Sequence, residues 1–333
     1  MQYLITGAAG FIGSFLCHKL AKEGNKIIAV DNFSNYYDVG LKNSRVKELL
    51  EPLDINVVNL DIVDDATFDN LVSKSKPDVV INLAAQAGVR LPLKETHKYV
   101  NNNLVGFSNV LRSTVDNKVP YFLYASSSSV YGDKAAIPYI ESEQNLQPTS
   151  FYGATKLANE LLTSTLIRNS STAARGLRFF TVYGPWGRPD MAYFRMIANV
   201  ISGAEFNFFG DGSVERDFTF VEDAVNSVMA LSTELQKRKS GYSDVVNLGG
   251  GRPLSMNYLL ETVSLISKKE VKFNRLNSNT NDAKKTMSDS RYIESLIGSK
   301  PSTKLEDGIA KTIEWAMRKD ISSNLNNWVK SVQ

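Results

Sequence analysis

Tyr152 and Lys156 stand four residues apart, and no other tyrosine in the sequence is followed by a lysine at that spacing. Residues four apart lie on the same face of a helix. A tyrosine loses its proton with an ordinary pKa of about 10, and a neighbouring ammonium group favours the phenolate. Ser126–Ser129 end an earlier apolar run and supply hydroxyl groups that can relay a proton. These residues predict a proton-transfer site with Tyr152 as general base, rather than two unrelated surface side chains.

The first glycines of the chain predict a binding site for a nucleotide phosphate. The segment Gly7–Gly13 follows an expected strand and opens an expected helix. Glycine permits a tight turn and a close approach of the backbone to a pyrophosphate, and a helix start supplies unpaired N–H groups with a positive dipole. The residues expected to face the cofactor here are Gly7, Gly10, Phe11, Ile12 and Gly13.

The ends of the following strands predict how the rest of the nucleotide is held. Asp31 ends the second expected strand, where a carboxylate accepts hydrogen bonds from ribose hydroxyls and repels a 2′-phosphate. Asn32 and Phe33 follow it without an arginine, so NAD is favoured over NADP. Asp61, after the third strand, either bonds the adenine amine or caps the next helix. The fourth strand ends in residues along which a cofactor can lie, Leu83, Ala84 and Ala85.

Short apolar runs alternate with amphipathic segments of helix length through the first half of the chain. The expected strands are Gln2–Thr6, Lys26–Val30, Asn56–Leu60, Asp78–Leu83, Tyr121–Ser126 and Gly176–Thr181. The expected helices are Phe11–Glu23, Leu41–Leu50, Asp64–Lys74, Thr96–Asn117 and Thr149–Asn169. Continuous apolar strands between helices are typical of a parallel sheet covered on both faces. The pattern predicts an α/β fold, a Rossmann-type doubly wound parallel sheet with a smaller C-terminal substrate-binding lobe.

The regular alternation of apolar runs and helix-length segments ends after Thr181. Tyr183–Asp190 is expected as a loop, Val221–Lys237 as a helix and Val245–Leu248 as one more core strand, before a helix over Ser255–Ser267. We therefore expect an NAD-binding domain over residues 1–181, to which the chain returns at residues 221–250. Residues 182–333 are expected to form mainly the substrate-binding lobe.

Composition excludes several classes of protein. Lys and Arg number 38 against 35 Asp and Glu, and a net charge of +3 does not indicate a nucleic-acid partner. The single cysteine, Cys17, excludes an internal disulfide and a four-cysteine zinc site, and the presence of only 2 histidines excludes a histidine-rich metal centre. The sequence has no apolar run of membrane-spanning length and no secretory leader. We therefore expect a cytoplasmic protein that needs no metal, nucleic acid or membrane.

Several motifs together resemble one enzyme family. They are the glycine segment, the serine-rich strand end, Ala84-Ala85, Tyr152–Lys156 and Arg216–Val221. In this combination nearly the whole chain resembles the extended short-chain dehydrogenase/reductases, and among them the NAD-dependent nucleotide-sugar epimerase/dehydratase family. Three further stretches resemble the UDP-glucuronate 4-epimerases of that family, namely Asp31–Asp38, Ala85–Arg90 and Arg178–Ala192.

The resemblance implies a role for each matching residue. Ser127 is then the catalytic hydroxyl, Tyr152 the base and Lys156 the residue that holds the nicotinamide ribose. Contacts to NAD are implied for Gly7, Gly10, Phe11, Ile12, Gly13, Asp31, Asn32, Asp61, Ile62, Leu83, Ala84, Ala85, Tyr152, Lys156 and Tyr183. Contacts to a UDP-sugar are implied for Arg90, Asn103, Ser127, Ser128, Ser129, Thr181, Arg188, Arg216 and Asp282. Asn281 departs from the family pattern, which has glycine before this aspartate.

Arg188 bears on the choice of sugar. It lies in a Gly/Pro loop after a core strand, where ligands gather in open α/β sheets, and a guanidinium can hold a carboxylate with two hydrogen bonds. Arg188 and Thr181 are expected to bind a sugar carboxylate, and an ion pair between Arg188 and Asp190 is the alternative. Dehydratases of the family carry an acid and a base where this chain has Ser128 and Ser129, so elimination of water is not expected.

The resemblance implies NAD-dependent 4-epimerisation of UDP-glucuronate to UDP-galacturonate through a 4-keto intermediate, with NAD tightly bound and regenerated in each cycle. A 4-epimerase of neutral UDP-hexoses or UDP-N-acetylhexosamines is the alternative, and a non-catalytic nucleotide sensor or scaffold is a more distant one. The resemblance also implies a homodimer whose four-helix interface includes Thr96–Asn117 and Thr149–Asn169.

Overall fold

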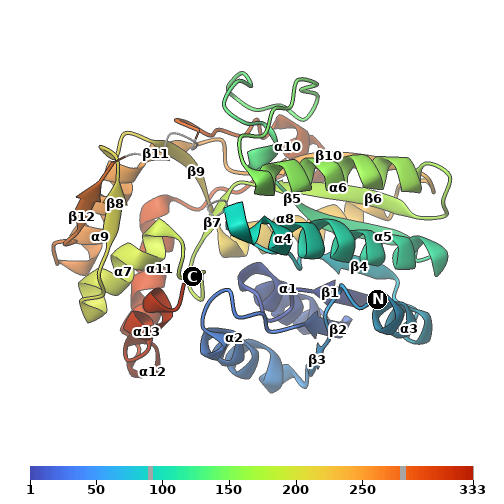
Figure 1. Ribbon diagram of the computed structural model, residues 1–333, viewed down its shortest axis with the longest axis horizontal. Helices are drawn as coiled ribbons and strands as arrows, with labels where there is room; N and C mark the ends of the chain where they lie inside the picture. Colours follow the sequence, from blue (N-terminus) through green and yellow to red (C-terminus); the bar gives the residue numbers. More distant parts are fainter. Residues whose placement is uncertain (89–92, 278–282, 333) are drawn as a thin grey trace.

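A seven-stranded parallel sheet forms the centre of the molecule (Figure 1). The computed structural model describes residues 1–88, 93–277 and 283–332. The strands lie in the order β10-β6-β5-β4-β1-β2-β3, which reverses at β1 and β4 and confirms the predicted doubly wound fold. Their bounds are β1 Gln2–Thr6, β2 Lys26–Asp31, β3 Val57–Asn59, β4 Val79–Asn82, β5 Tyr121–Ser127, β6 Ala173–Phe179 and β10 Ser243–Leu248.

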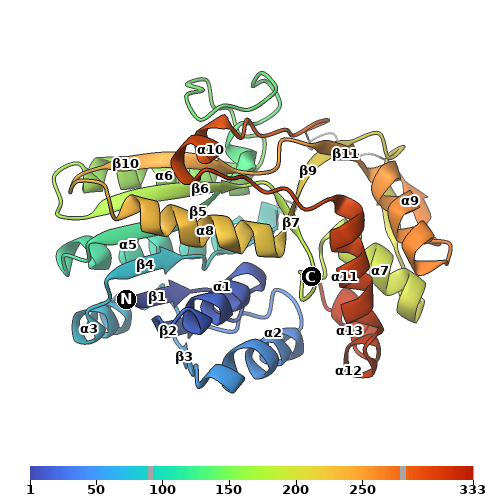
Figure 2. The same ribbon diagram turned by 180° about the vertical axis from the view of Figure 1, so that it is seen from behind.

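Apolar side chains alternate between the two faces of this sheet. Leu4 and Val80 face one layer of helices, whereas Ile5 and Ile81 face the other. The first layer consists of α3, α5 and α6, and the second contains α1 and α8 (Figures 1 and 2). Because helices cover both faces of the sheet, the side chains on both sides of its strands are mainly apolar, and the strands are continuous apolar runs in the sequence. The helices are α1 Phe11–Lys22, α3 Asp65–Ser75, α5 Phe107–Asp116, α6 Phe151–Ile167 and α8 Val221–Leu235.

The carboxyl ends of β1 and β4 meet where the strand order reverses. A Cβ added to Gly7 would lie 2.8 Å from Ala84 N and 2.9 Å from Leu83 C. Gly7 also has a φ of 72°, in the left-handed region that favours glycine. Ligands of open α/β sheets bind in the crevice at such a reversal. The residues predicted to bind the nucleotide after β1, β2 and β4 therefore share one edge of the sheet.

A smaller lobe lies beside the central sheet, at the left of Figure 1. It contains the three-stranded sheet β11-β9-β7 and the parallel pair β12-β8. Its strands are β7 Thr181–Tyr183, β8 Asn207–Phe209, β9 Glu215–Phe220, β11 Pro253–Ser255 and β12 Asn274–Leu276. Its helices are α7 Ala192–Ser202, α9 Met256–Ser267, α11 Leu305–Met317, α12 Lys319–Ser322 and α13 Leu325–Lys330, and α10 Arg291–Ile297 packs on α8 and β10.

Two predicted elements differ from the structure in ways that affect the site. The helix expected over Thr96–Asn117 is divided into α4 (Thr96–Tyr99), a π-helical segment Val100–Gly106 and α5. A π-helical turn inserts an extra residue and is frequent at functional sites. The strand expected to end at Thr181 is also divided: β6 stops at Phe179, and Thr181 pairs with Phe218 in the small sheet. The chain thus changes sheets just before the Arg188 loop.

Two features are absent from the described part of the chain, a membrane-spanning helix and a cluster of metal-binding side chains. No helix there is long and apolar enough to cross a membrane. The same residues contain no group of three or more His, Cys, Asp or Glu side chains arranged to hold a metal ion. Cys17 is buried in α1, and burial raises the pKa of its thiol.

Candidate active site

Ser127, Tyr152 and Lys156 come together at the carboxyl end of β5. Ser127 is the last residue of β5, and the other two lie in the first two turns of α6. The hydroxyl of Ser150 caps α6 by accepting a hydrogen bond from Gly153 N at 3.0 Å. Ser127 lies close enough to Tyr152 to lower the pKa of its phenol. The structure therefore assembles the three residues that the sequence predicted for proton transfer.

Burial and charge act in opposite directions on Tyr152. Burial raises the pKa of its phenol, whereas the Arg188 guanidinium and the nearby Ser127 hydroxyl lower it, and the net result lies above the ordinary value. Burial also lowers the pKa of the Lys156 ammonium to about 8. The Nζ of Lys156 donates to Ala125 O at 2.8 Å and lies 5.6 Å from the centre of the Tyr152 ring. In the protein alone Tyr152 is thus a neutral phenol at pH 7, and added positive charge would favour the phenolate.

The turn between β1 and α1 is lined by backbone at Gly7, Gly10 and Gly13. α1 begins at Phe11 with Gly10 as its N-cap, and no side chain caps its first N–H groups. A Cβ on Gly10 would lie 2.8 Å from Gly7 O, and a Cβ on Gly13 would overlap the same carbonyl. Uncapped N–H groups beside such a turn fit the pyrophosphate of a dinucleotide. Ile12 is half-buried at the same helix start.

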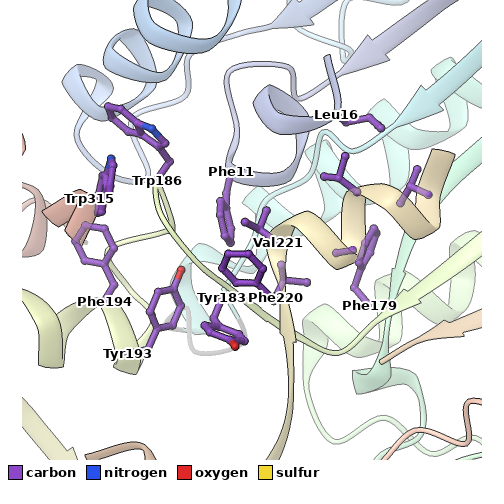
Figure 3. Close-up of a cluster of buried hydrophobic side chains, with 14 of the residues drawn as sticks. Phe11, Leu16, Phe179, Tyr183, Trp186, Tyr193, Phe194, Phe220, Val221 and Trp315 are labelled. Carbon is purple, nitrogen blue, oxygen red and sulfur yellow. The ribbon is translucent and has the colours of Figure 1, made fainter. Parts of the chain in front are cut away.

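Two of the predicted cofactor residues turn their side chains into the core. Phe11 and Tyr183 belong to a buried aromatic cluster between α1 and the small lobe (Figure 3). The Tyr183 ring is fully buried, with its centre 5.6 Å from that of Phe220, and its hydroxyl donates to Lys304 O at 3.2 Å. Because protein encloses both rings, only the backbones of these two residues are left for a cofactor.

Asp31 holds the turn around it as well as facing the expected ribose position. It is 6% exposed, and its carboxylate accepts hydrogen bonds from Ala9 N at 3.1 Å and Phe33 N at 2.8 Å. The Nζ of Lys42, in α2 (Val39–Arg45), lies 3.3 Å from Asp31 Oδ1. A carboxylate has about four acceptor positions, so one remains for a ribose hydroxyl. Lys42 was not predicted, because its approach to Asp31 depends on how α2 folds back.

Asn32 and Asp61 lie side by side at the end of β2. Asn32 Nδ2 donates to Asp61 Oδ2 at 2.9 Å, and Asp61 Oδ1 accepts from Val63 N at 2.9 Å. The residue that caps α3 is Asp64, whose Oδ1 accepts from Thr67 N at 3.2 Å. The alternative expectation that Asp61 caps this helix is therefore wrong. Its exposed carboxylate stays a candidate for contact with adenine.

Asn103 ties the segment after β4 to the catalytic helix. It is 1% exposed, its Oδ1 accepts from Gln86 N at 2.8 Å, and its Nδ2 donates to Gln86 O at 3.1 Å and Thr155 Oγ1 at 3.2 Å. These contacts give Asn103 a positioning role, and a direct contact with a sugar stays a prediction. Ile62 is likewise buried, under Gly106 of the same π-helical segment. The half-buried residues at the crevice edge are Leu83, Ala84 and Ala85.

Arg188 is paired within the site. Its Nε and Nη2 donate to the two carboxylate oxygens of Asp190 at 3.0 Å and 2.6 Å, so the ion pair named as the alternative is present. Although burial disfavours both charges, Asp190 raises the pKa of the guanidinium and Arg188 lowers the pKa of the carboxyl. The hydroxyl of Tyr36 donates to Asp190 Oδ2 at 3.3 Å. Arg188 is 26% exposed, and Nη1 takes no part in the bonds to Asp190.

Ser127, the last residue of β5, forms one tight turn with Ser128 and Ser129. Ser127 Oγ donates to Ser129 Oγ at 3.1 Å and accepts from Ser129 N at 3.1 Å. Ser128 begins the 3₁₀ turn that follows. None of the three has a side chain that could act as a carboxylic acid or a carboxylate base. Thr181, the partner expected for Arg188, is half-buried in β7.

Arg216 lies on β9, at the edge of the small lobe. Its Nη1 donates to Glu215 O at 2.9 Å and to Ala283 O at 2.8 Å. The contact with Ala283 ties β9 to the segment that begins at residue 283. Arg90 and Asp282 themselves lie outside the described residues, as does Asn281.

A buried polar network behind α6 was missed in the sequence. Arg178 forms two hydrogen bonds with Glu160 at 2.9 Å and 2.8 Å, and Ser126 Oγ donates to Glu160 Oε1 at 2.5 Å. Arg178 Nη1 also donates to the hydroxyl of Tyr131 at 2.8 Å, and that hydroxyl donates to Asn247 Oδ1 at 2.7 Å. The network joins β5, β6, β10 and α6 around the catalytic pair. Arg178 and Glu160 were not paired beforehand, because only the sheet brings them together.

Comparisons with known proteins agree with one another on the family of this chain. Residues 3–249 match the model of the NAD dependent epimerase/dehydratase family. A Rhizobium meliloti protein named probable UDP-glucuronate 4-epimerase is 36% identical over 95% of this chain and 96% of its own length. UDP-glucuronate 4-epimerase 1 of Arabidopsis thaliana is 38% identical over 95% of this chain and 76% of its own. The crystal structure of the Bacillus cereus UDP-glucuronic acid 4-epimerase with UDP-glucuronic acid and NAD is 33% identical, with a TM-score of 0.86 over 95% of this chain and 98% of that one.

Proposed function

The chain belongs to the NAD dependent epimerase/dehydratase family, and we propose that it catalyses NAD-dependent 4-epimerisation of UDP-glucuronate to UDP-galacturonate through a 4-keto intermediate. The observation that carries the proposal is the position of Arg188. Its guanidinium is close enough to Tyr152 to lower the pKa of the phenol. A sugar carboxylate on this guanidinium would therefore bring the sugar ring to the proton-transfer centre.

The described residues fit a dinucleotide cofactor. The glycine turn at Gly7–Gly13 would hold the pyrophosphate, Asp31 the adenosine ribose and Lys156 the nicotinamide ribose. NAD, when bound, supplies the acceptor and the donor of hydride at C4 and the positive charge of the nicotinamide. Asp31 would oppose a 2′-phosphate, so NAD rather than NADP is proposed.

Tyr152 and Ser127 would move the proton of the C4 hydroxyl. Because Ser127 lies close to Tyr152, Ser127 would hold the substrate hydroxyl while the Tyr152 Oη takes its proton and later returns it. The Lys156 ammonium, buried beside the ring, favours the phenolate that this step requires. Ser128 and Ser129 offer neither an acid nor a base for elimination of water, so the sugar keeps its hydroxyl groups.

Arg188 and Thr181 would hold the sugar carboxylate. Asp190 occupies Nε and one proton of Nη2, so the substrate would use Nη1 and the remaining Nη2 proton. Arg216, on the small lobe, is proposed to meet the UDP phosphates, and Arg90 and Asp282 keep their implied roles in UDP-sugar binding. The small lobe, over residues 182–333, would thus mainly bind the nucleotide sugar, and the sheet would mainly bind NAD.

One observation keeps the neutral-sugar 4-epimerase as a second candidate. A buried arginine without a substrate carboxylate would be costly if it lacked another partner. Asp190 already provides that partner, so the charge of Arg188 alone does not require an acidic sugar. Binding of UDP-hexoses or UDP-N-acetylhexosamines must therefore be compared directly.

Product analysis tests the proposal. Purified protein is incubated with UDP-glucuronate, UDP-glucose or UDP-N-acetylglucosamine, and the products are separated by chromatography. We expect UDP-galacturonate from the first and far less product from the other two. Conversion of a neutral sugar alone would favour the second candidate, and no conversion of any sugar by protein loaded with NAD would favour a sensor or scaffold.

A homodimer is proposed from the apolar surface of one helix layer. Large apolar side chains are exposed on the π-helical segment and on α6, namely Val100, Val105, Phe151, Leu161, Leu162 and Leu166. This face belongs to the helices that the resemblance placed in a four-helix interface. Sedimentation should give twice the chain mass, and Leu161→Asp, at a side chain that is 61% exposed, should give monomers. A nucleotide-sugar substrate also fits the expected cytoplasmic location, which cell fractionation would check.

A further inference from the structure

Arg45, the last residue of α2, is a fully buried cation in an unusual setting. Within the described chain its hydrogen bonds go to uncharged oxygens. Nε donates to Trp186 O at 2.8 Å, Nη2 to Gly187 O at 2.9 Å, and Nη1 to Ala9 O at 3.2 Å and to the Tyr37 hydroxyl at 2.7 Å. A buried charge held only by neutral groups is costly, so its presence calls for a reason other than stability.

The two carbonyls on the Nε/Nη2 edge belong to the residues immediately before Arg188. Trp186 has a φ of 61°, which is unfavourable for a residue with a side chain, and a Cβ on Gly187 would overlap the Tyr193 hydroxyl. The backbone at Trp186 and Gly187 therefore has a conformation that local conformational preferences disfavour. Arg45 holds both carbonyls of these residues, and the direction in which Arg188 leaves the loop depends on it.

Two neighbouring tyrosines are connected to this loop, Tyr37 through Arg45 and Tyr36 through Asp190. Tyr37 is 6% exposed and accepts a hydrogen bond from Arg45, whereas Tyr36 donates to Asp190, the partner of Arg188. Both follow β2 in the stretch Asp31–Asp38. In this stretch only Asp31 and Asn32 are expected to contact NAD, so the two tyrosines have no role in the proposed reaction. Through Ala9 O, Arg45 also contacts the glycine turn of the cofactor site.

We propose that Arg45, Tyr36 and Tyr37 are positioning residues that fix Arg188 beside Tyr152 and so set the preference for an acidic sugar. The inference rests on the proposed function, because it takes Arg188 as the group that meets the sugar carboxylate. A guanidinium is required, since its planar edge spans two successive carbonyls and an ammonium does not. The same residues link the NAD turn to the substrate loop.

Binding in an unreactive background measures this preference without turnover. Each variant is made in the Tyr152→Phe protein, and calorimetry gives the Kd of UDP-glucuronate and of UDP-glucose. Tyr36→Phe and Tyr37→Phe each remove one hydroxyl and should reduce the preference for UDP-glucuronate by about two- to tenfold, the usual effect of one hydrogen bond. Arg45→Lys keeps the charge and should reduce it further. Amide exchange over residues 184–190 should become faster in Arg45→Lys and Tyr37→Phe.

Matched controls separate positioning from a general loss of structure. Tyr121→Phe removes a hydroxyl that donates to Gln236 O, and Arg175→Lys changes a fully buried arginine paired with Glu234 and Asp244. Both lie away from the crevice and should leave the preference and the loop exchange unchanged. Tyr36→Phe should add no further loss when Arg188→Ala is already present, because Tyr36 acts through that arginine.

The outcomes distinguish this inference from the proposed function. If Arg188→Ala abolishes the preference while Arg45→Lys and the two tyrosine variants retain it, with unchanged exchange, the positioning role is overturned and the proposed function stands. If the protein shows no preference for UDP-glucuronate and forms no UDP-galacturonate, the proposed function fails. Faster loop exchange together with a reduced preference supports the positioning role.

Discussion

Tyr152 and Lys156 lie where burial disfavours the charged form of each. Burial raises the pKa of the phenol and lowers that of the ammonium to about 8. Arg188 opposes the first of these effects, so the cation proposed to bind the substrate would also tune the proposed base. The site therefore depends on a few buried charges, because electrostatic interactions are stronger in the protein interior than in water.

Tyr152→Phe should abolish turnover of UDP-glucuronate and leave NAD bound, because the ring remains and only the ionisable oxygen is lost. Initial rates and the nucleotide content of the purified protein are measured side by side. Tyr121→Phe, remote from the site, is the control. A rate within tenfold of the unchanged protein would remove Tyr152 from the role of base.

Lys156→Met should stabilise the nucleotide-free protein at pH 7. Burial lowers the pKa of Lys156 from 10.5 to about 8, so the charged form costs stability below pH 8, and this cost disappears as the pH rises toward 10.5. The gain in the free energy of unfolding should be about 1–3 kcal/mol at pH 7, after the lost hydrogen bond to Ala125 O is allowed for. Urea unfolding at pH 7 and pH 10 should show the difference shrinking. A difference that grows with pH would contradict this sign.

Arg188→Ala should weaken turnover of UDP-glucuronate far more than that of UDP-glucose. A lost charge-assisted hydrogen bond is worth about 1.5–3 kcal/mol, or about 10- to 150-fold in kcat/KM. Thr181→Val, which keeps the shape and removes a hydroxyl, should act in the same direction more mildly. An equal fall for both sugars would assign Arg188 to the loop or the diphosphate instead. The acid limb of the pH–rate profile should also move to higher pH, because Arg188 lowers the pKa of Tyr152.

At the scale of elements, α6 must keep a fixed position along the strands of the sheet. Its first turns carry Tyr152 and Lys156, and Asn103 and Glu160 fasten it to the π-helical segment and to β6. Glu160 lies one turn beyond Lys156, so a shift of this ion pair would move the catalytic pair relative to Ser127. The cap at Ser150 fixes the start of the same helix.

Glu160→Gln should lower the free energy of unfolding by about 3–5 kcal/mol, because it leaves the buried guanidinium of Arg178 without its carboxylate. Urea unfolding is the measurement. Glu222→Gln is the matched control, since its pair with Lys311 is about half exposed and should contribute less than about 1 kcal/mol. Equal small effects at both positions would show that the Glu160–Arg178 pair does not fix α6.

At the scale of the whole molecule, the crevice lies where the sheet reverses its strand order and the small lobe joins it. The aromatic cluster in Figure 3 brings Phe11 of α1 together with residues of the small lobe, such as Phe194 and Trp315. The centres of the Trp186 and Trp315 rings lie 5.1 Å apart, so the loop that precedes Arg188 is packed against α11. The cofactor turn and the substrate lobe therefore share one core.

Protein denatured by heat should release NAD rather than NADP. In the proposed site Asp31 would accept a hydrogen bond from the adenosine ribose and repel a 2′-phosphate, even though the ammonium of Lys42 lies beside it. Chromatography of the released nucleotide checks this. Asp31→Asn is the comparison, and it should retain less NAD because one charged acceptor is lost. NADP in the released fraction would overturn the role given to Asp31.

The sequence by itself determined the central sheet, the glycine turn and the placement of Tyr152 and Lys156 together on one helix. Each depends on neighbours in sequence: alternating apolar runs, glycines next to a strand end, and a spacing of four on one helix. β10 was also predicted, because its apolar run stands between clear helical segments. Family motifs carry the same local information, and for that reason they identified the chemistry.

Only the tertiary structure decided which distant charges meet. Arg188 with Asp190 is close in sequence, but Lys42 with Asp31, Glu160 with Arg178, and Arg45 with the carbonyls of Trp186 and Gly187 depend on the packing of separate elements. The transfer of Thr181 to the small sheet and the division of the helix before α5 have the same origin. Burial and pairing are set by the whole fold, because a charge is stable inside a protein only where distant parts of the chain supply its partners.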